Sequence, residues 1–330
     1  MVTPLSLRRQ VGQLLVSSFD GTVVPAYLRR RLAAGETAGV IAFAKNGGLA
    51  VAWRRLTRSV QRAAGGAALV AVDQEGGAIR SLPFAAPLLG QPAQGAPAVV
   101  RALARRSATE LRALGINVNL APVADVATGP ASVMASRAFS GNAVEVGAAT
   151  RAAVAGLDAG GVAATAKHFP GLGAATANTD DAPATIGVSR SLLLRRELVP
   201  FRSAIAAGVP LVMLSHGVYP ALDARRIASQ SRAIATRLLR DRLGFEGVVV
   251  TDSLEAQAVL ERSGVAEAAV RSVRAGADLL LVTGSASWNE AFPKLLATAR
   301  RSPAFRARVA ESAARVLALK RRLRLRSPAP

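Results

Sequence analysis

The stretch G-G-V-A-A-T-A-K-H-F-P-G, residues 160–171, contains the two features that decide the fold and the chemistry of this chain. Two glycines end a helix-like segment and are followed by the apolar run 162–166. Lys167 and His168 come directly after that run. A glycine stop followed by a short, continuously apolar run predicts a helix that leads into a buried strand. The two polar residues are then expected at the carboxyl end of that strand.

The same unit of helix, glycine, apolar run and polar residue recurs along the chain. The runs expected to form strands are 11–16, 40–43, 68–72, 116–120, 162–166, 211–214, 248–250 and 278–282. Most of these runs are continuously apolar, which predicts strands buried on both faces, as in a parallel sheet. About eight such units in 330 residues predict an α/β fold of the (β/α)8 TIM-barrel type. The alternative, an open doubly wound sheet, lacks a G-x-G-x-x-G turn after its first strand.

Length and composition favour one domain over residues 1–330. Hydrophobic residues make up 51% of the chain, which supports a sizeable core, and no linker-like segment divides it. We expect residues 304–324 to form a terminal helix packed outside the barrel. The absence of cysteine excludes disulfides, thiolate metal sites and cysteine nucleophiles.

The N-terminal segment 1–9 has no charged-then-apolar signal layout. No apolar run approaches the ~18 residues needed to span a bilayer. We therefore expect a soluble cytoplasmic protein, or an extracytoplasmic one if a leader has been removed.

The net charge of +21 raises the question of a nucleic-acid partner. The arginines are spread along helix-like segments, and only the tail 320–326 is dense in them. Aromatic residues are 4% of the chain and are not interleaved with basic residues, as base-stacking sites require. We expect no specific nucleic-acid partner, although such a charge implies a general attraction to polyanions.

Polar residues gather where a barrel places its chemistry, at the carboxyl ends of the strands. The residues expected there are Asp73, Lys167, His168, His216 and Asp252. Both histidines of the chain belong to this set, and lysine occurs only four times. Because the composition makes these residues rare, their position indicates an active site.

Each of these residues also has an ordinary structural interpretation. Asp252 is equally compatible with a nucleophile or general base and with the N-cap of the next helix. His168 could be a buried histidine satisfied by the backbone, with Lys167 extending beside it to solvent. The segment 73–77 suits hydroxyl binding or a metal, but two histidines are too few to favour a metal. The loop up to Pro183 could carry a catalytic acid or could simply connect two elements.

Ordered motifs along nearly the whole chain resemble a known family. These are G-Q-L-L (12–15), V-D-Q-E-G-G (72–77), N-L-A-P-V-A-D-V (119–126), S-R-A-F (136–139), K-H-F-P-G (167–171), S-H-G-V-Y-P-A-L-D (215–223) and L-G-F-E-G-V-V-V-T-D (243–252). Together and in this order they resemble the single-domain bacterial β-N-acetylglucosaminidases, also called β-N-acetylhexosaminidases, of glycoside hydrolase family three. The resemblance implies a (β/α)8-type barrel, no cofactor or metal, and a carbohydrate substrate.

The resemblance also implies roles for individual residues. Asp252 matches the catalytic nucleophile, which forms a covalent glycosyl-enzyme. Residues that match holders of the sugar hydroxyls are Asp73, Arg137, Lys167 and His168, and His216 matches a position that lines the pocket. The implied reaction is retaining, with carboxyl partners usually about 5–5.5 Å apart. The implied substrate carries terminal β-linked N-acetylglucosamine, and we expect a peptidoglycan-derived fragment and a monomeric enzyme.

The chain departs from the family at the acid/base loop. The family reads K-H-F-P-G-H-G and later D-S-H, whose histidine is the acid/base paired with that aspartate. Here Leu172 stands where the second histidine is expected, and N-T-D (178–180) replaces D-S-H. The histidine–aspartate dyad is therefore missing.

Three hypotheses follow from this departure. Asp180, or its neighbour Asp181, could replace the histidine as acid/base. The enzyme could instead lack a strong acid and handle only good leaving groups or transfer sugars. The protein could also be a sugar or cell-wall-fragment binder without catalysis. The presence of Asp252 favours an enzyme, because binding alone needs no nucleophile. Further alternatives are a β-glucosidase and a polyanion-binding protein on the same barrel.

Overall fold

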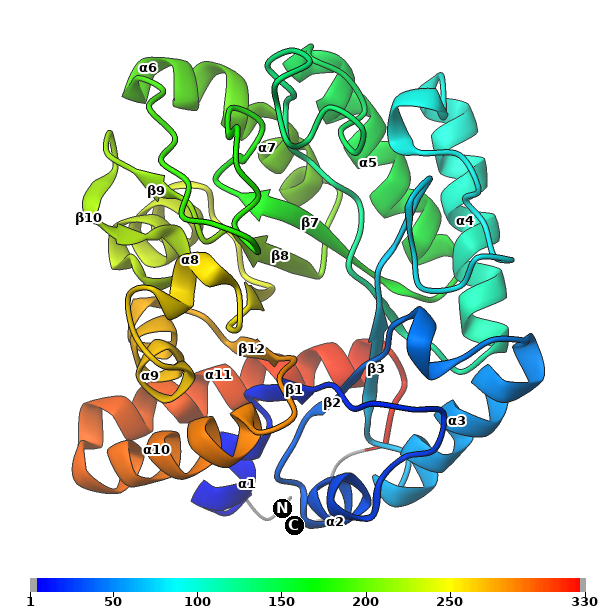
Figure 1. Ribbon diagram of the computed structural model, residues 1–330, viewed down its shortest axis with the longest axis vertical. Helices are drawn as coiled ribbons and strands as arrows, with labels where there is room; N and C mark the ends of the chain where they lie inside the picture. The colour runs from blue at the N-terminus through cyan, green and yellow to red at the C-terminus, as the bar shows by residue number, and fades with distance from the viewer. Residues whose placement is uncertain (1–4, 327–330) are drawn as a thin grey trace.

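Eight parallel strands close into a barrel in the computed structural model, which describes residues 5–326 (Figure 1). In their order around the barrel they are β1 (Leu15–Ser17), β12 (Leu279–Val282), β11 (Val248–Ser253), β8 (Leu211–Leu214), β7 (Ala163–Phe169), β6 (Val118–Asn119), β3 (Leu69–Val72) and β2 (Gly39–Ile41). The predicted (β/α)8 barrel is confirmed. Residues 1–4, part of the segment 1–9 discussed above, lie outside the described residues, as do residues 327–330.

Helices surround the barrel, as Figure 1 shows. Their bounds are α1 (Leu7–Gly12), α2 (Ala26–Ala34), α3 (Ala50–Ala63), α4 (Pro97–Ala113), α5 (Ala143–Ala159), α6 (Arg190–Leu192), η3 (Leu193–Glu197), α7 (Leu198–Ala206), η5 (Ala233–Arg242), α8 (Gln257–Leu260), α9 (Val265–Ala275), α10 (Ser287–Arg301) and α11 (Pro303–Arg322). Shorter elements are the turns η1 (Ala44–Asn46), η2 (Gln91–Ala93) and η4 (Ala228–Gln230), and the hairpins β4 (Gln74–Gly76) with β5 (Ile79–Arg80) and β9 (Val218–Tyr219) with β10 (Asp223–Ile227).

The barrel strands divide their side chains between two apolar layers. In β8, Leu211 and Met213 join the cluster inside the barrel. Val212 and Leu214 join the larger cluster between the strands and the helices. Alternate side chains of a strand point to opposite faces, so both faces need apolar residues here. This is why most of the strand runs are apolar over several consecutive positions.

A helix, α1, occupies the start of the apolar run 11–16, where the sequence predicts only a strand. Val11 belongs to α1, whose first turn is capped by Ser6, and β1 starts at Leu15. The apolar residue is explained by burial of the helix, since Val11 is fully buried. The strand prediction was therefore wrong for residues 11–14 of this run.

Helix α11 corresponds to the terminal helix expected at 304–324, and it crosses the amino-terminal end of the barrel. Val316, Leu319 and Leu323 pack in the cluster inside the barrel. Arg322 donates to the carbonyl of Gly208, in the turn before β8, at 3.1 Å. The opposite, carboxyl end of the barrel is left to the loops. No helix among residues 5–326 has the length and apolar content to cross a membrane.

Candidate active site

A cavity of about 650 Å³ lies at the carboxyl ends of the barrel strands. It brings together most of the residues predicted from the sequence. Those that line it are Asp73, Arg137, Lys167, His168, Asp180 and Asp252. They come from β7, β11, the residue after β3, and the two long loops 120–142 and 170–189.

Lys167 sits at the centre of a buried ionic network. Its Nζ is 2.7 Å from Asp73 Oδ1 and 2.6 Å from Glu75 Oε1. Glu75 also accepts two hydrogen bonds from Arg137, at 2.6 Å from Nη2 and 2.9 Å from Nε. Lys167 and Glu75 are each 3% exposed. Lys167 therefore does not extend to solvent, and its ammonium is fixed at the wall of the cavity.

The charges of this network hold each other in the ionised state. Burial alone would raise the pKa of Glu75, but Lys167 and Arg137 outweigh it and lower the pKa to about 2. Burial alone would lower the pKa of Lys167, but Asp73 and Glu75 outweigh it and raise the pKa. Glu75, Lys167 and Arg137 are thus charged at neutral pH. They offer a sugar both donors and acceptors in fixed positions.

His168 is held by a buried carboxylate behind it. Its Nδ1 is 2.7 Å from Asp125 Oδ2, and its backbone N–H lies 3.2 Å from Asp125 Oδ1. Asp125 also accepts from the backbone N–H of Leu172 at 2.6 Å and is fully buried. Because a carboxylate accepts, Nδ1 carries the proton, and Nε2 lies 3.8 Å from Asp252 Oδ2. His168 is thus satisfied by a side chain rather than the backbone, and its other nitrogen faces the nucleophile candidate.

Asp252 lies near the end of β11 and is 22% exposed at its side chain. The backbone N–H of Ser253 donates to its Oδ1 at 2.8 Å. Burial would raise the pKa of Asp252, but His168, Lys167 and the Ser253 amide outweigh it and lower the pKa. The next helix, α8, has Ala256 as its N-cap, without a side-chain hydrogen bond. The N-cap interpretation of Asp252 is therefore wrong, and an ionised carboxylate is left facing the cavity.

The loop that carries Asp180 is attached to the segment following Asp252. The carbonyl of Asp180 accepts from the backbone N–H of Gln257 at 3.0 Å, and that of Thr179 accepts from Ala258 at 3.1 Å. Asp180 is exposed at the cavity edge. Partial desolvation and the negative charge of Asp252 raise the pKa of Asp180. The pKa values of Asp180 and Asp252 are therefore shifted in opposite directions.

The structure corrects the predicted position of His216. Its ring is fully buried and is not among the residues lining the cavity. Nε2 is 2.8 Å from the carbonyl oxygen of Ser253, and Nδ1 is 2.8 Å from Ser229 Oγ. A carbonyl only accepts, so Nε2 donates, and burial lowers the pKa of His216. A neutral His216 therefore supports the backbone next to Asp252 from behind the wall.

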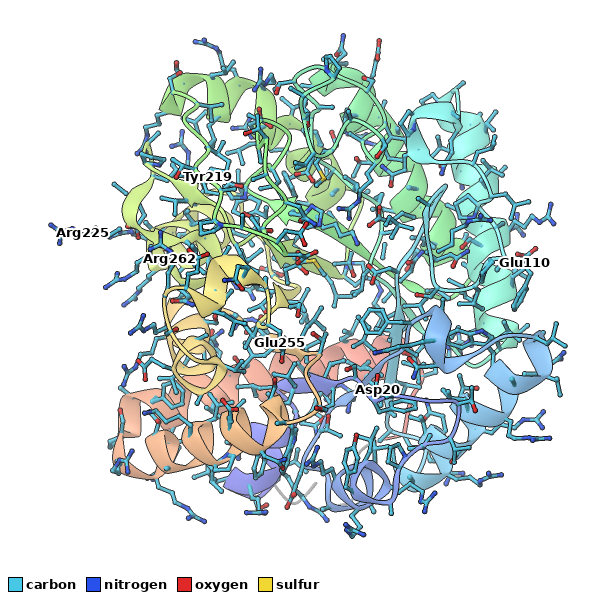
Figure 2. All side chains as sticks on the ribbon, viewed as in Figure 1. Asp20, Glu110, Tyr219, Arg225, Glu255 and Arg262 are labelled. Atoms are coloured by element: carbon cyan, nitrogen blue, oxygen red, sulfur yellow. The ribbon has the colours of Figure 1, made fainter. Side chains whose placement is uncertain are left out.

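Glu255 ties the ends of two barrel strands together near the nucleophile candidate. Its Oε2 accepts from Ser253 Oγ at 2.9 Å and from the N–H and Oγ1 of Thr283 at 2.8 Å each. Figure 2 shows Glu255 near the middle of the molecule, where β11 and β12 end. Glu255 therefore orders the backbone that follows Asp252.

Sequence reasoning named several residues of the cavity but gave no individual role to two carboxylates that hold them in place. Glu75 and Asp125 occur in the quoted motifs at 72–77 and 119–126 without a role. A signal for both was present, since an acidic residue in a buried stretch needs a partner. Their partners lie 43 to 92 positions away along the chain, so the sequence did not show which residues pair.

The arrangement can hold a polar ligand by its hydroxyls and attack it with a carboxylate. One carboxylate is ionised, a second has a raised pKa, and both line one cavity with a lysine and a histidine. Pairs of carboxyl groups with separated pKa values are how glycosidases divide nucleophile and acid. Among residues 5–326 no group of three or more His, Cys, Asp or Glu side chains is placed to hold a metal ion.

Comparison with known proteins agrees with this chemistry. Residues 6–319 match the glycosyl hydrolase family 3 N-terminal domain. A beta-hexosaminidase of Xanthomonas campestris pv. campestris is 36% identical over 279 residues, covering 82% of this chain and 84% of that protein. The beta-N-acetylhexosaminidase of Beutenbergia cavernae DSM 12333 has a TM-score of 0.89 at 34% identity, covering 96% of this chain and 98% of that one.

A longer solved structure has the same barrel. The family 3 beta-N-acetylglucosaminidase from Paenibacillus sp. str. FPU-7 has a TM-score of 0.92 at 36% identity and covers 97% of this chain. The present chain spans 63% of the length of that enzyme. With its barrel, its cavity and these matches, the chain belongs to glycosyl hydrolase family 3.

Proposed function

We propose that this protein is a retaining glycoside hydrolase that removes terminal β-linked N-acetylglucosamine, with Asp252 as nucleophile and Asp180 as acid/base. The observation that carries the assignment is the pair of carboxyl groups in one cavity, with the pKa of Asp252 lowered and that of Asp180 raised. The choice of sugar is supported by the hexosaminidase and N-acetylglucosaminidase relatives.

In the first step, Asp252 attacks the anomeric carbon and the bond to the leaving group breaks. Asp180, protonated, transfers its proton to the glycosidic oxygen, so the aglycone leaves as a neutral alcohol. In the second step, Asp180 takes a proton from water, and the oxygen of that water displaces Asp252 from the anomeric carbon. Both carboxyl groups return to their starting protonation states, and the configuration of the sugar is retained.

The ionic network around Lys167 would hold the hydroxyls of the sugar. Lys167 occupies Asp73 Oδ1, which leaves Asp73 Oδ2 free to accept from a hydroxyl. Arg137 is bidentate on Glu75 and is 22% exposed at its side chain, so its outer face remains available to the ligand. Because these groups are already ionised and paired, binding requires little reorganisation.

The nucleophile can be tested by intact mass after incubation with an activated 5-fluoro glycoside of N-acetylglucosamine. The wild type is expected to gain the mass of one sugar, and Asp252→Asn is expected to gain none. Since this probe needs little acid assistance, it tests the nucleophile separately from the acid. Absence of an adduct with both this probe and its gluco-configured equivalent would instead support a sugar or cell-wall-fragment binder.

The acid/base can be tested by varying the leaving group. Asp180→Asn is expected to lower kcat/KM for alkyl glycosides by about 10²–10⁴-fold, while a dinitrophenyl glycoside keeps most of its glycosylation rate. Asp181→Asn is the matched control, because Asp181 lies next in the same loop and shares the Asn178 contact. Equal losses in both variants, or equal losses for both leaving groups, would contradict the assignment of Asp180.

We further propose that the natural substrate is a peptidoglycan-derived fragment and that the enzyme acts as a monomer. The monomer is supported by the fact that one chain provides every charged group described at the cavity. The proposed substrate can be tested by incubating the enzyme with muropeptides and measuring the released N-acetylglucosamine by chromatography. Light scattering of the eluting protein tests the oligomeric state.

A further inference from the structure

We propose that a groove between β10, η4 and α9, separate from the sugar cavity, binds a ligand that carries several phosphate groups. The proposal concerns a surface that the proposed glycosidase mechanism does not use. It would stand even if the sugar or the acid/base were assigned differently.

The groove has a volume of about 840 Å³ and is unusually rich in arginine. Six of its ten lining residues are arginines, namely Arg225, Arg226, Arg232, Arg262, Arg271 and Arg274. The remaining lining residues are Ile227, Gln230, Glu267 and Ala275. Figure 2 shows Arg225 and Arg262 along the same edge of the molecule. The chain is rich in arginine throughout, but its basic residues are 42 of 330, so this density is local.

Carboxylates of the protein leave most of this charge uncompensated. Glu267 is the one acidic lining residue, and it is shared by Arg271 at 3.2 Å and Lys294 at 3.5 Å. Among the described residues no carboxylate lies within 4.0 Å of the side chains of Arg225, Arg226 or Arg232. Repulsion between such closely grouped cations is relieved when an anion binds among them.

A neighbouring arginine-rich cavity shows what internal compensation looks like in this protein. There the fully buried Asp278 pairs with Arg240, with Arg308 at 2.6 Å and with Arg315 at 3.3 Å. Glu311 pairs again with Arg308 at 2.9 Å. That cavity, which shares Arg232 and Arg274 with the groove, has several paired counter-charges, whereas the groove of β10 and α9 has only Glu267 in its lining. The contrast singles out the groove as the place for an external anion.

Gln230 provides a second, independent indication of a ligand. Its side chain lines the groove and the residue is only 6% exposed. Its Nε2 is buried and has no hydrogen-bond partner. An unsatisfied buried amide donor costs about 1–3 kcal/mol, so such groups usually have a partner. A phosphate oxygen in the groove would supply the missing acceptor.

Phosphate without nucleobases fits the groove best. The forked guanidinium matches phosphate oxygens in a bidentate manner, and six of them require a ligand with several closely spaced charges. The lining contains no Phe, Tyr or Trp on which bases could stack. The favoured ligands are therefore a linear polyphosphate or a polymer linked by phosphodiesters, rather than a nucleic acid.

The test is calorimetric titration of the full chain with sodium tripolyphosphate at 0.15 M salt. The wild type is expected to bind one equivalent. The triple variant Arg225→Gln/Arg226→Gln/Arg232→Gln is expected to bind at least about tenfold more weakly, since hydrogen bonds to charged groups are the strong ones. The matched control is Arg54→Gln/Arg55→Gln/Arg58→Gln, which removes the same charge from exposed positions of α3 and is expected to bind like the wild type.

Two further measurements separate a built site from a general field of charge. Gln230→Met keeps the size of the side chain and removes the amide; it is expected to weaken binding several-fold without lowering the melting temperature, because the amide makes no bond in the free protein. Wild-type binding is expected to be tighter for tripolyphosphate than for a single-stranded oligonucleotide of equal charge. Absence of wild-type binding at millimolar tripolyphosphate, equal weakening in both triple variants, unchanged binding by Gln230→Met, or preference for the oligonucleotide would each overturn the proposal.

Discussion

Replacement of Lys320 by methionine is expected to stabilise this protein at neutral pH. Lys320 lies in α11 under the barrel, is 3% exposed, and donates to Gln13 Oε1 at 2.7 Å. No carboxylate of the described residues pairs with it, and burial lowers its pKa to about 7 from an ordinary value of 10.5. The folded protein therefore pays the cost of an ammonium without a counter-ion, or of deprotonating it.

The magnitude follows from the pKa difference between the folded and unfolded chain. Because burial lowers the pKa of Lys320 from 10.5 to about 7, it destabilises the fold by about 5 kcal/mol below pH 7, since each tenfold change in proton affinity corresponds to about 1.4 kcal/mol. At pH 7, half of the folded molecules carry the proton on Lys320, and the destabilisation is then about 4 kcal/mol. Methionine removes this term but leaves Gln13 Oε1 without its donor, which costs about 1–3 kcal/mol. The net gain expected at pH 7 is therefore about 1–3 kcal/mol.

The sign of the pH dependence distinguishes this explanation from better packing. Because the folded pKa is lowered, the unfolded chain binds the extra proton between pH 7 and pH 10.5, so wild-type stability at this site rises with pH by up to about 1.4 kcal/mol per unit. Urea unfolding of wild type and Lys320→Met at pH 7 and pH 10 should show the gain shrinking or reversing at pH 10. Lys294→Met, at an exposed position, is the control and should show no such change. A gain of Lys320→Met that is the same at both pH values would refute the reasoning.

Three further expectations concern the cavity. Glu75→Gln leaves the buried Lys167 short of one counter-charge and should lower the free energy of unfolding by about 3–5 kcal/mol. In the wild type, the lowered pKa of Glu75 contributes about 3 kcal/mol of this stability above pH 4.5, and this contribution is lost as the pH falls towards 2. Urea titrations of both proteins at pH 7 and pH 3 check this, and a difference that does not shrink at pH 3 would contradict it. Asp125→Asn should lower kcat/KM by about 10–100-fold because His168 is no longer held in position, with little change in the far-ultraviolet circular dichroism. Steady-state kinetics test this, and an unchanged kcat/KM would show that Asp125 does not position His168 for the reaction. The raised pKa of Asp180 should appear as an alkaline limb in kcat/KM, since activity falls as the acid loses its proton; a pH–rate profile of Asp180→Asn that keeps this limb would assign it to another group.

The barrel could be predicted because its pattern is local. Each strand is a short apolar run after a glycine or a turn, and each run is bounded by residues adjacent in sequence. The failure at Val11 has a local reason as well, because a buried helix turn and a buried strand look alike over six residues. Only tertiary packing decides between them.

Several side chains that line the cavity could be predicted from the sequence, but the residues that hold them in position could not. Asp73, Lys167 and Asp252 stand at the ends of apolar runs, and in a barrel the ends of the strands meet at one cavity. The support given by Asp125 depends on a contact across 43 positions, which no periodicity encodes. His216 satisfies the same end-of-strand rule but turns behind the wall to the carbonyl of Ser253. The rule predicts that a polar residue lies at the end of a strand, but the direction of its side chain depends on the neighbouring backbone.

The coupling between Asp180 and Asp252 gives the proposed acid/base a way to change role within one turnover. In the free enzyme, the charge of Asp252 is one of the causes that raise the pKa of Asp180, and so it favours the protonated form that the first step needs. Formation of the glycosyl ester at Asp252 removes that charge, and the pKa of Asp180 then falls. A lower pKa favours the carboxylate, which is the form that takes a proton from water in the second step. The backbone bond from Gln257 to Asp180 keeps the loop beside the segment that follows Asp252. A carboxyl group in place of the histidine dyad of the family is therefore consistent with both half-reactions, because burial and the charge of the proposed nucleophile both raise the pKa of Asp180, and the second of these causes is removed in the glycosyl-enzyme.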